Sequence, residues 1–215
     1  MRERLGELML MPVIEIPDAG LAVPLADALI AGGLPAIEIT FRTPAAAASI
    51  AAIAGARPEV LVGAGTVRSA EQVDVAMDSG ARFLVSPGVS PGVVGYARER
   101  GMPILPGVCT PTEIEMAHDL GIELVKFFPA GPSGGPGYLK ALTGPYGSVG
   151  FVPTGGITSQ TLPDYLAIGQ VVAVGGSWMA PSELIADGDF GGITVLVAEA
   201  VAAARRSRAT AGGEG

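Results

Sequence analysis

Eight short aliphatic runs alternate with Ala-rich stretches of helical pattern, and this alternation constrains the fold more than any other feature of the chain. Short connections between alternating strands and helices indicate a parallel sheet. The composition agrees, because a chain that is 49% hydrophobic but only 5% aromatic suits aliphatic strands buried on both faces. The predicted strands cover residues 10–16, 36–41, 60–65, 82–86, 102–105, 124–128, 149–153 and 171–175.

The helical stretches between the strands carry end signals. Thr110-Pro111-Thr112-Glu113, for example, offers a hydroxyl cap, a proline and an early acid at a helix start. Strand–helix repeats in a chain of 215 residues favour closure into a (β/α)₈ TIM barrel, a single domain over residues 1–204. An open doubly wound sheet is the alternative, but its glycine fingerprint after the first strand is missing. The predicted helices cover residues 20–31, 44–54, 69–79, 91–100, 112–120, 137–142, 161–168, 181–186 and 192–206.

Charge and composition exclude several classes of partner. A net charge of −8 argues against binding to nucleic acid, which needs clustered Lys and Arg. Apolar runs are too short for a membrane span, and residues 1–10 are too short and too charged for a signal peptide. The single cysteine, Cys109, favours a reducing compartment, so we expect a cytoplasmic protein. The polar, Gly-rich tail 205–215 is expected to fray.

Lys126 lies in the middle of an aliphatic strand, Leu124-Val125-Lys126-Phe127-Phe128, although lysine occurs elsewhere only at position 140. Either face of a barrel strand would largely desolvate an ammonium group. Burial disfavours the charged form, and a neutral amine is a nucleophile towards ketones. The alternative is a lysine that reaches solvent from the strand end or pairs with an acid. Lys140 falls in a helical pattern and is expected to be a solvated surface residue.

Polar residues alternate with apolar ones in the second predicted strand. Glu38, Thr40 and Arg42 share one face, which we expect to point into the barrel. A buried glutamate beside a cation suits a general acid/base, and Arg42 at the strand end could hold a carboxylate. The alternative is a Glu38–Arg42 ion pair that serves structure alone. Thr66, in Gly63-Ala64-Gly65-Thr66 at the end of the third strand, offers a hydroxyl at the same edge.

Two Gly-Gly turns follow the last two predicted strands, at Gly155-Gly156 and Gly175-Gly176. Turns at these places match a common phosphate site of barrels, in which backbone N–H groups and a helix N-terminus hold the anion. A metal is not expected, because one histidine, His118, and one cysteine cannot make the usual zinc site. No acidic cluster suggests magnesium, and we expect no other cofactor.

Six motifs, in this order along the chain, carry a resemblance to a known family: Glu38-Ile39-Thr40-Phe41-Arg42-Thr43, Gly63-Ala64-Gly65-Thr66, Ser86-Pro87-Gly88, Lys126-Phe127-Phe128-Pro129-Ala130, Pro153-Thr154-Gly155-Gly156-Ile157 and Gly175-Gly176-Ser177-Trp178. They resemble the motifs of the 2-keto-3-deoxy-6-phosphogluconate (KDPG) aldolases, a family in which many members also cleave 4-hydroxy-2-oxoglutarate (KHG). The resemblance runs from about Val13 to Ala204. It implies a Schiff-base lyase that cleaves KDPG to pyruvate and glyceraldehyde 3-phosphate.

The resemblance implies a role for each matching residue near the reacting carbons. Lys126 would form the Schiff base with the C2 carbonyl, and Glu38 would move protons through a water molecule. Arg42 and Thr66 would hold the pyruvate carboxylate, and Phe128 would pack beside the imine. Family members need no metal and are typically homotrimers.

The same resemblance also implies which residues bind the end of the substrate that lies away from the imine. Thr154 would contact the sugar-derived hydroxyls, and the phosphate would bind Gly155, Gly156, Gly176 and Ser177. A sister family that acts on the galactonate epimer usually has an aliphatic residue in place of Thr154, so the hydroxyl favours the gluconate epimer.

Three alternatives and one departure stay open at this point. The chain could act on the galactonate epimer, could be a phosphosugar isomerase or epimerase, or could be a barrel that only binds a phosphorylated metabolite. The last two would not need a lysine in the sixth strand. The departure is Glu15, where some family members have an arginine near the end of the first strand, so an additional phosphate contact could be missing.

Overall fold

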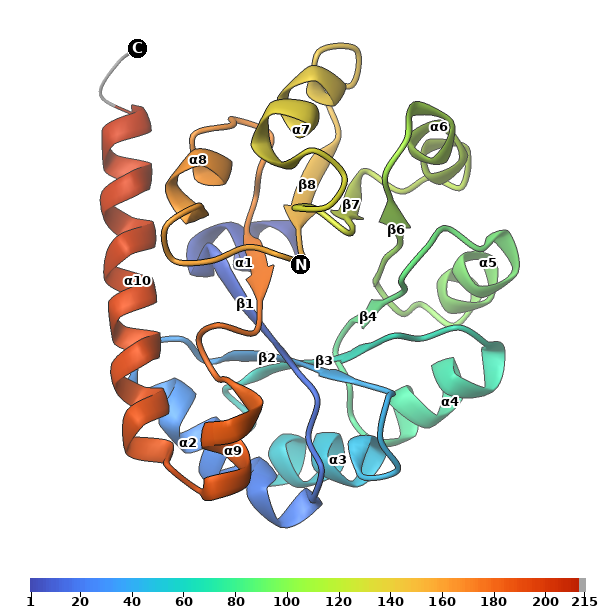
Figure 1. Ribbon diagram of the computed structural model, residues 1–215. Coiled ribbons are helices and arrows are strands. Elements are labelled where there is room, and N and C mark those ends of the chain that lie inside the picture. The colour runs from blue at the N-terminus through green and yellow to red at the C-terminus, as the bar shows by residue number, and fades with distance from the viewer. Residues whose placement is uncertain (213–215) are drawn as a thin grey trace.

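Parallel strands wrapped by helices form a barrel in the computed structural model, which describes residues 1–212 (Figure 1). One sheet has the order β5-β4-β3-β2-β1-β9 and the other the order β6-β7-β8. Single bridges from Thr154 to Gly175 and from Phe151 to Val171 join β8 to the segment containing β9. The predicted (β/α)₈ barrel is therefore confirmed, and the open doubly wound alternative is wrong. The strands are β1 (Leu10–Ile14), β2 (Ala36–Thr40), β3 (Leu61–Gly65), β4 (Leu84–Val85), β5 (Ile104–Leu105), β6 (Gly107–Val108), β7 (Leu124–Phe127), β8 (Gly150–Pro153) and β9 (Val174–Gly176).

The fifth predicted strand, 102–105, ends before Pro106 as β5, and a further short strand that was not predicted, β6, follows this proline. Proline has no N–H to donate, so the ladder that joins β5 to β4 cannot continue through this residue. The Pro106 carbonyl instead accepts the N–H of Lys126 at 2.9 Å, and Gly107 in β6 pairs with Lys126 in β7. This interruption separates the two sheets without opening the barrel, because the chain itself runs through it.

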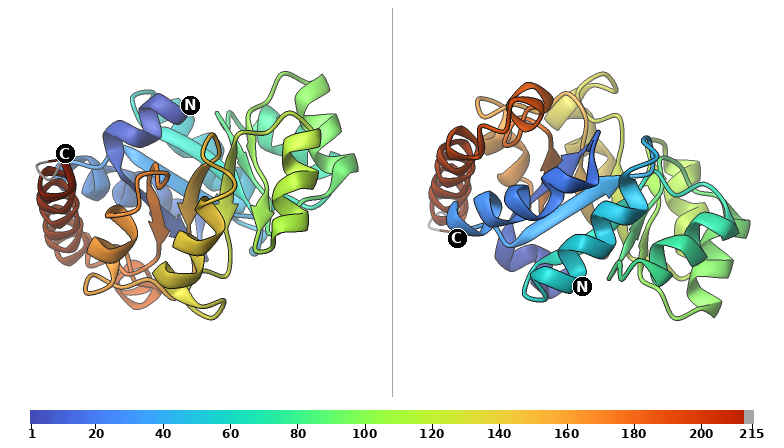
Figure 2. Two further views of the ribbon diagram at one scale, coloured as in Figure 1. Left: turned by 90° about the horizontal axis from the view of Figure 1, so that it is seen from above. Right: turned by 90° about the horizontal axis from the view of Figure 1, so that it is seen from below.

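Helices cover the outside of the barrel, and their predicted end signals are present. Thr110 and Glu113 form a capping box at the start of α6, in which the Thr110 N–H donates to the Glu113 carboxylate at 2.8 Å. Figure 2 shows α10 along one side of the barrel, where it packs against α2 and α8. The helices are α1 (Arg2–Leu8), α2 (Ala22–Ala31), α3 (Ala46–Ala56), α4 (Ala70–Asp78), α5 (Pro91–Glu99), α6 (Pro111–Asp119), α7 (Gly135–Thr143), α8 (Leu162–Leu166), α9 (Ser182–Asp187) and α10 (Phe190–Gly212), with a 3₁₀ turn η1 at Ala19–Leu21.

The two ends of the chain differ from the sequence-based expectation. The pattern of residues 1–10 did not predict α1, in which Leu5 is only 1% exposed and lines the same interior void as Glu38. At the other end, α10 continues to Gly212, so the expectation of a frayed tail is corrected for residues 205–212. Arg208 donates to the carbonyls of Val171 and Val172, at 3.1 and 3.2 Å, which ties this part of α10 to the barrel. Residues 213–215 lie outside the described part.

Among residues 1–212, no helix is both long enough and apolar enough to cross a membrane.

Gly95 gives a prediction about stability. It lies in the interior of α5, where an added Cβ would meet nothing within 4 Å. Because alanine favours a helix over glycine, we expect Gly95→Ala to raise the free energy of unfolding by about 0.5–1 kcal/mol, measured by urea denaturation. Gly107→Ala is the opposing control, since its Cβ would lie 2.2 Å from the Pro87 carbonyl oxygen and should cost about 1–3 kcal/mol. A Gly95→Ala protein less stable than the parent would contradict the prediction.

Candidate active site

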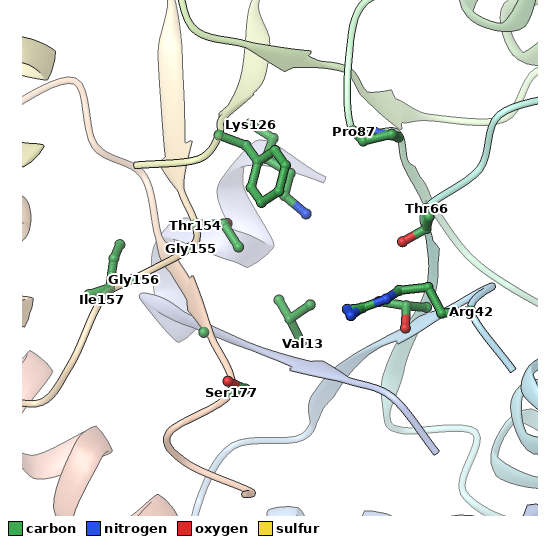
Figure 3. A pocket seen from close by; sticks show the side chains of 13 residues that line it. Val13, Arg42, Thr66, Pro87, Lys126, Thr154, Gly155, Gly156, Ile157 and Ser177 are labelled. Atoms are coloured by element: carbon green, nitrogen blue, oxygen red, sulfur yellow. The ribbon is translucent and has the colours of Figure 1, made fainter. Parts of the chain in front are cut away.

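A cavity of about 210 Å³ opens at the carboxyl ends of the strands, where the barrel architecture leads one to look for a site. Figure 3 shows Lys126 entering the cavity from one side, Arg42 and Thr66 from the opposite side, and Val13 between them. Every strand except the short β4, β5 and β6 contributes a lining residue or is directly followed by one. The lining is Val13, Thr40, Arg42, Thr66, Pro87, Lys126, Phe128, Thr154, Gly155, Gly156, Ile157, Gly176 and Ser177.

Lys126 and Glu38 form an ion pair at the inner end of this cavity. The Lys126 Nζ lies 3.3 Å from Glu38 Oε1, and the two residues are 7% and 3% exposed. Their neighbours Val125 and Ile37 are fully buried on the opposite, helix-facing sides of β7 and β2. The pleat of each strand therefore places the charged group inside the barrel. The predicted inward orientation of Glu38 is confirmed. For Lys126, whose face the sequence left open, the structure places the side chain inside the barrel and pairs it with an acid.

Gly65 makes room for the Glu38 carboxylate. An ideal Cβ built on Gly65 would lie 2.2 Å from Glu38 Oε1 and 2.9 Å from its carboxyl carbon. Gly65 pairs with Thr40 in the β2–β3 ladder, beside the end of the strand that carries Glu38. Nothing in the Gly63-Ala64-Gly65-Thr66 motif of the sequence indicates that Glu38 is the group that approaches Gly65.

Arg42 pairs with Glu15 and not with Glu38. The Arg42 guanidinium lies 2.9 Å from the Glu15 carboxylate, and the two side chains are 58% and 45% exposed. The alternative of a structural Glu38–Arg42 pair is therefore wrong, because Arg42 lies four residues after Glu38, beyond the end of β2 and at the mouth of the cavity. Arg42 also lines the cavity, so it faces both Glu15 and the space that a ligand would fill. The departure at Glu15 is thereby explained: its carboxylate is a partner of Arg42.

Thr66 occupies an unusual backbone conformation. Its φ is 60°, in the left-handed region that β-branched residues rarely adopt. Strain of this kind persists where the surrounding structure enforces it and is concentrated at functional sites. Val67 is held by the hydrogen bond that its N–H donates to Val85, at 3.0 Å. The result is that the Thr66 side chain points into the cavity (Figure 3).

The Gly155-Gly156 turn and strand β9 meet at another side of the cavity. Gly175 and Gly176 belong to β9, so the expectation of a turn at these two residues is corrected. Gly155 and Gly156 have φ values of 97° and 75°, which explains why glycine is needed at both positions. Gly156 lines the cavity together with Gly176 and Ser177, as expected. The expected helix N-terminus is also corrected: the next helices begin only at Leu162 and Ser182, so the Gly155-Gly156 turn and the end of β9 border the cavity here.

Thr154 lies between the ion pair and these turns. An ideal Cβ on Gly175 would lie 2.4 Å from the Thr154 hydroxyl, so that glycine leaves space for the threonine side chain. The hydroxyl has only a long contact, 3.4 Å, to the Val152 carbonyl, which leaves it free to bind a ligand.

Phe128 provides an apolar wall. Its ring centroid lies 5.2 Å from the Lys126 Nζ, within the range of a cation–π contact. The remaining apolar lining comes from Val13, Pro87 and Ile157, to which the sequence analysis gave no role. Pro87 belongs to the Ser86-Pro87-Gly88 motif, and this motif was the one feature of the sequence that could have placed Pro87 at the site.

Other polar residues considered from the sequence lie outside the cavity lining. His118 in α6 and Lys140 in α7 are exposed. Cys109 is half-buried, and its N–H donates to Glu113 at 2.8 Å. Within residues 1–212, no group of three or more His, Cys, Asp or Glu side chains is arranged to hold a metal ion.

Comparisons with known proteins agree with this geometry. The family model described as KDPG and KHG aldolase matches residues 1–196. A 2-dehydro-3-deoxy-phosphogluconate aldolase of Treponema pallidum is 49% identical over 90% of this chain and 92% of its own length.

Solved structures give the same result. The 2-keto-3-deoxy-6-phosphogluconate aldolase of Zymomonas mobilis ZM4, crystallised with 3-phosphoglycerate, superposes with a TM-score of 0.87 at 40% identity, covering 94% of this chain and 95% of that one. The KDPG aldolase of Legionella pneumophila, with pyruvate captured at low pH as a covalent carbinolamine intermediate, has a TM-score of 0.87 at 37% identity, covering 90% and 96%. The chain belongs to the KDPG and KHG aldolase family.

Proposed function

We propose that this protein is a class I aldolase that cleaves KDPG to pyruvate and D-glyceraldehyde 3-phosphate through a Schiff base on Lys126. The observation that carries the proposal is the pairing of Lys126 with Glu38 at 3.3 Å, at the inner end of a cavity whose lining includes Gly155, Gly156 and Gly176. A buried lysine beside a carboxylate supplies both a nucleophile and the group that can take up its proton. Membership of an aldolase family supports the same chemistry.

The reaction begins when the neutral Lys126 amine attacks the C2 carbonyl of the substrate and forms a carbinolamine. Loss of water gives a protonated imine, which acts as an electron sink. Glu38 then removes the proton of the C4 hydroxyl, the C3–C4 bond breaks, and its electron pair forms an enamine at C2 and C3. Glyceraldehyde 3-phosphate leaves as the aldehyde. The enamine takes a proton at C3, and hydrolysis of the imine releases pyruvate and the free lysine.

The rest of the cavity suits the two ends of that substrate. The Arg42 guanidinium and the Thr66 hydroxyl lie across the cavity from Lys126, where they would bind the carboxylate next to C2 (Figure 3). Phe128 would pack against the imine. Because Arg42 donates to Glu15 through one nitrogen and a guanidinium has five N–H groups, the ion pair leaves donors free for a ligand.

The phosphate would bind where the Gly155-Gly156 turn meets the end of β9. Gly155, Gly156, Gly176 and Ser177 line the cavity there, and their backbone N–H groups and the Ser177 hydroxyl would be the donors, without a side-chain cation among them. The same protein could cleave 4-hydroxy-2-oxoglutarate to pyruvate and glyoxylate, because that substrate needs only the imine end of the cavity.

Borohydride trapping tests the proposal. Incubation with pyruvate and borohydride should add the mass of a reduced pyruvate imine to the protein, and peptide mapping should locate it at Lys126. The comparison without pyruvate should show no adduct. No adduct at saturating pyruvate would exclude the imine mechanism.

Thr154 gives a prediction about the C4 epimer. Valine has the shape of threonine without the hydroxyl, so Thr154→Val should lower kcat/KM for KDPG by about tenfold, the effect of losing one hydrogen bond to the substrate. We expect a smaller loss on the galactonate epimer. Steady-state kinetics on both epimers measure the ratio, and equal losses would assign Thr154 no part in stereospecificity. Higher activity of the parent protein on the galactonate epimer would favour that substrate instead.

Assembly and location stay predictions, the first drawn from the family resemblance and the second from the single cysteine. We expect a homotrimer, which sedimentation equilibrium would test. We also expect a cytoplasmic protein, in keeping with one half-buried cysteine and a metabolite substrate.

A further inference from the structure

Trp178, the only tryptophan of the chain, packs directly on the backbone of Gly176. An ideal Cβ on Gly176 would lie 1.9 Å from Cζ3 and 2.1 Å from Cε3 of the indole. The larger ring of Trp178 therefore covers the side of Gly176 that a side chain would otherwise occupy. Gly176 is not among the glycines with positive φ, so its backbone conformation would admit alanine. Contact with Trp178, and not backbone strain, is what requires glycine at this position.

The segment under the ring has few other side chains to hold it. β9 spans Val174–Gly176, and two of its three residues are glycines, which lose more conformational freedom on ordering than other residues do. Gly175 faces inward towards Thr154 and Gly176 faces outward towards Trp178. The backbone of this segment borders the cavity through Gly176 and Ser177. The ring thus packs on the outer side of a strand end whose inner side faces the cavity.

The indole N–H of Trp178 does not explain why a tryptophan occupies this position. Its Nε1 is buried and has no hydrogen-bond partner among the described residues. A buried donor without a partner lowers stability, so a purely apolar side chain would satisfy this position better if filling space were its only role. The ring also separates two surface grooves, one towards α9 and one between residues 158–160 and α10, so that it lies at the edge of the core.

We propose that Trp178 is a positioning residue for the phosphate end of the substrate. By packing on Gly176, the ring holds the Gly176–Ser177 segment in the position from which it borders the cavity. This inference rests on the proposed function, because it needs a phosphate at that end. It predicts that Trp178 affects substrates with a phosphate and does not affect the imine chemistry at Lys126.

Kinetics on two substrates test this inference. Trp178→Ala should raise KM for KDPG about tenfold, the effect of one well-placed interaction, and leave the kinetics on 4-hydroxy-2-oxoglutarate within about twofold. Phe190→Ala, which removes another half-buried aromatic side chain, should change neither. An unchanged KM for KDPG, or equal losses on both substrates, would overturn the positioning role. If Trp178→Ala does not fold, Trp178→Phe, which has a shorter ring, provides the same comparison with a smaller expected effect.

A double-mutant cycle with Gly176→Ala tests the contact itself. Gly176→Ala alone should raise KM for KDPG by about tenfold or more, because its Cβ would collide with the ring. In the double variant Gly176→Ala/Trp178→Ala, KM should be no higher than in Trp178→Ala alone. Multiplicative effects would show that the two residues act independently and would overturn the inference.

Failure of the inference can be told apart from failure of the proposed function. Glyceraldehyde 3-phosphate binding, measured by calorimetry, needs no turnover and should weaken about tenfold in Trp178→Ala. The pyruvate adduct at Lys126 should form equally well in this variant and in the parent. If the parent forms no adduct, the imine mechanism is excluded, and the calorimetric comparison still decides whether Trp178 supports anion binding.

Discussion

Lys126→Arg is expected to lower the rate of KDPG cleavage by about 10⁴-fold or more, the scale of losing a covalent nucleophile. The physical reason is that arginine keeps the positive charge but cannot be deprotonated to a nucleophilic amine. The variant should stay folded, because a guanidinium can still pair with the Glu38 carboxylate, which lies 3.3 Å from the present ammonium. The measurement is pyruvate release from KDPG, together with the borohydride adduct, which should be absent.

Lys140→Arg is the matched control, since Lys140 is the other lysine and lies exposed in α7. Its activity should equal that of the parent. Lys126→Arg activity within about tenfold of the parent would contradict a nucleophilic role. The alternative is a barrel that only binds a phosphorylated metabolite. It would be favoured if the parent protein had no aldolase activity and if Lys126→Arg still bound a phosphorylated ligand.

The strand periodicity of the sequence predicts the barrel well, because buried parallel strands must be continuous aliphatic runs. The two-residue alternation also predicts that Glu38 points inward, and it does, whereas for Lys126 it predicts burial without deciding between the two faces of the strand. The partners of these groups are less predictable. Glu38 lies 88 positions before Lys126, and only closure of the barrel brings the two together.

Other features depend on contacts that no local pattern contains. The end of β5 before Pro106 follows from the missing N–H of proline, which the sequence does show. By contrast, α1 is stabilised by burial of Leu5 against the barrel. The pairing of Arg42 with Glu15 joins the ends of neighbouring strands, so it depends on register. In the sequence, nothing distinguishes Gly65 and Gly176 from other glycines. Only the positions of the Glu38 and Trp178 side chains in the structure explain why glycine is needed there.

Glu38→Gln is expected to slow KDPG turnover by about 10²-fold or more, as for the loss of a general acid/base. Glutamine preserves the size and shape of the side chain, which matters because Gly65 leaves no spare room beside it. An amide can still accept a hydrogen bond from Lys126 but cannot take up the C4 hydroxyl proton. Imine formation should therefore stay detectable by borohydride trapping with pyruvate, while kcat for cleavage falls.

The control is Glu59→Gln, at an exposed position outside the cavity lining, which should leave the rate unchanged. An unchanged rate in Glu38→Gln would reduce Glu38 to a structural partner of Lys126.

Gly65→Ala tests whether proton transfer depends on the position of the Glu38 carboxylate as well as on its presence. This substitution keeps Glu38 but places a Cβ where the Glu38 carboxylate now lies, 2.2 Å from Oε1, so the carboxylate has to move. If proton transfer depends on the geometry of Glu38, Gly65→Ala should slow cleavage in the same way as Glu38→Gln, and combining the two changes should add little. If the effects multiply instead, Gly65 contributes to the site independently of Glu38, and the carboxylate tolerates displacement.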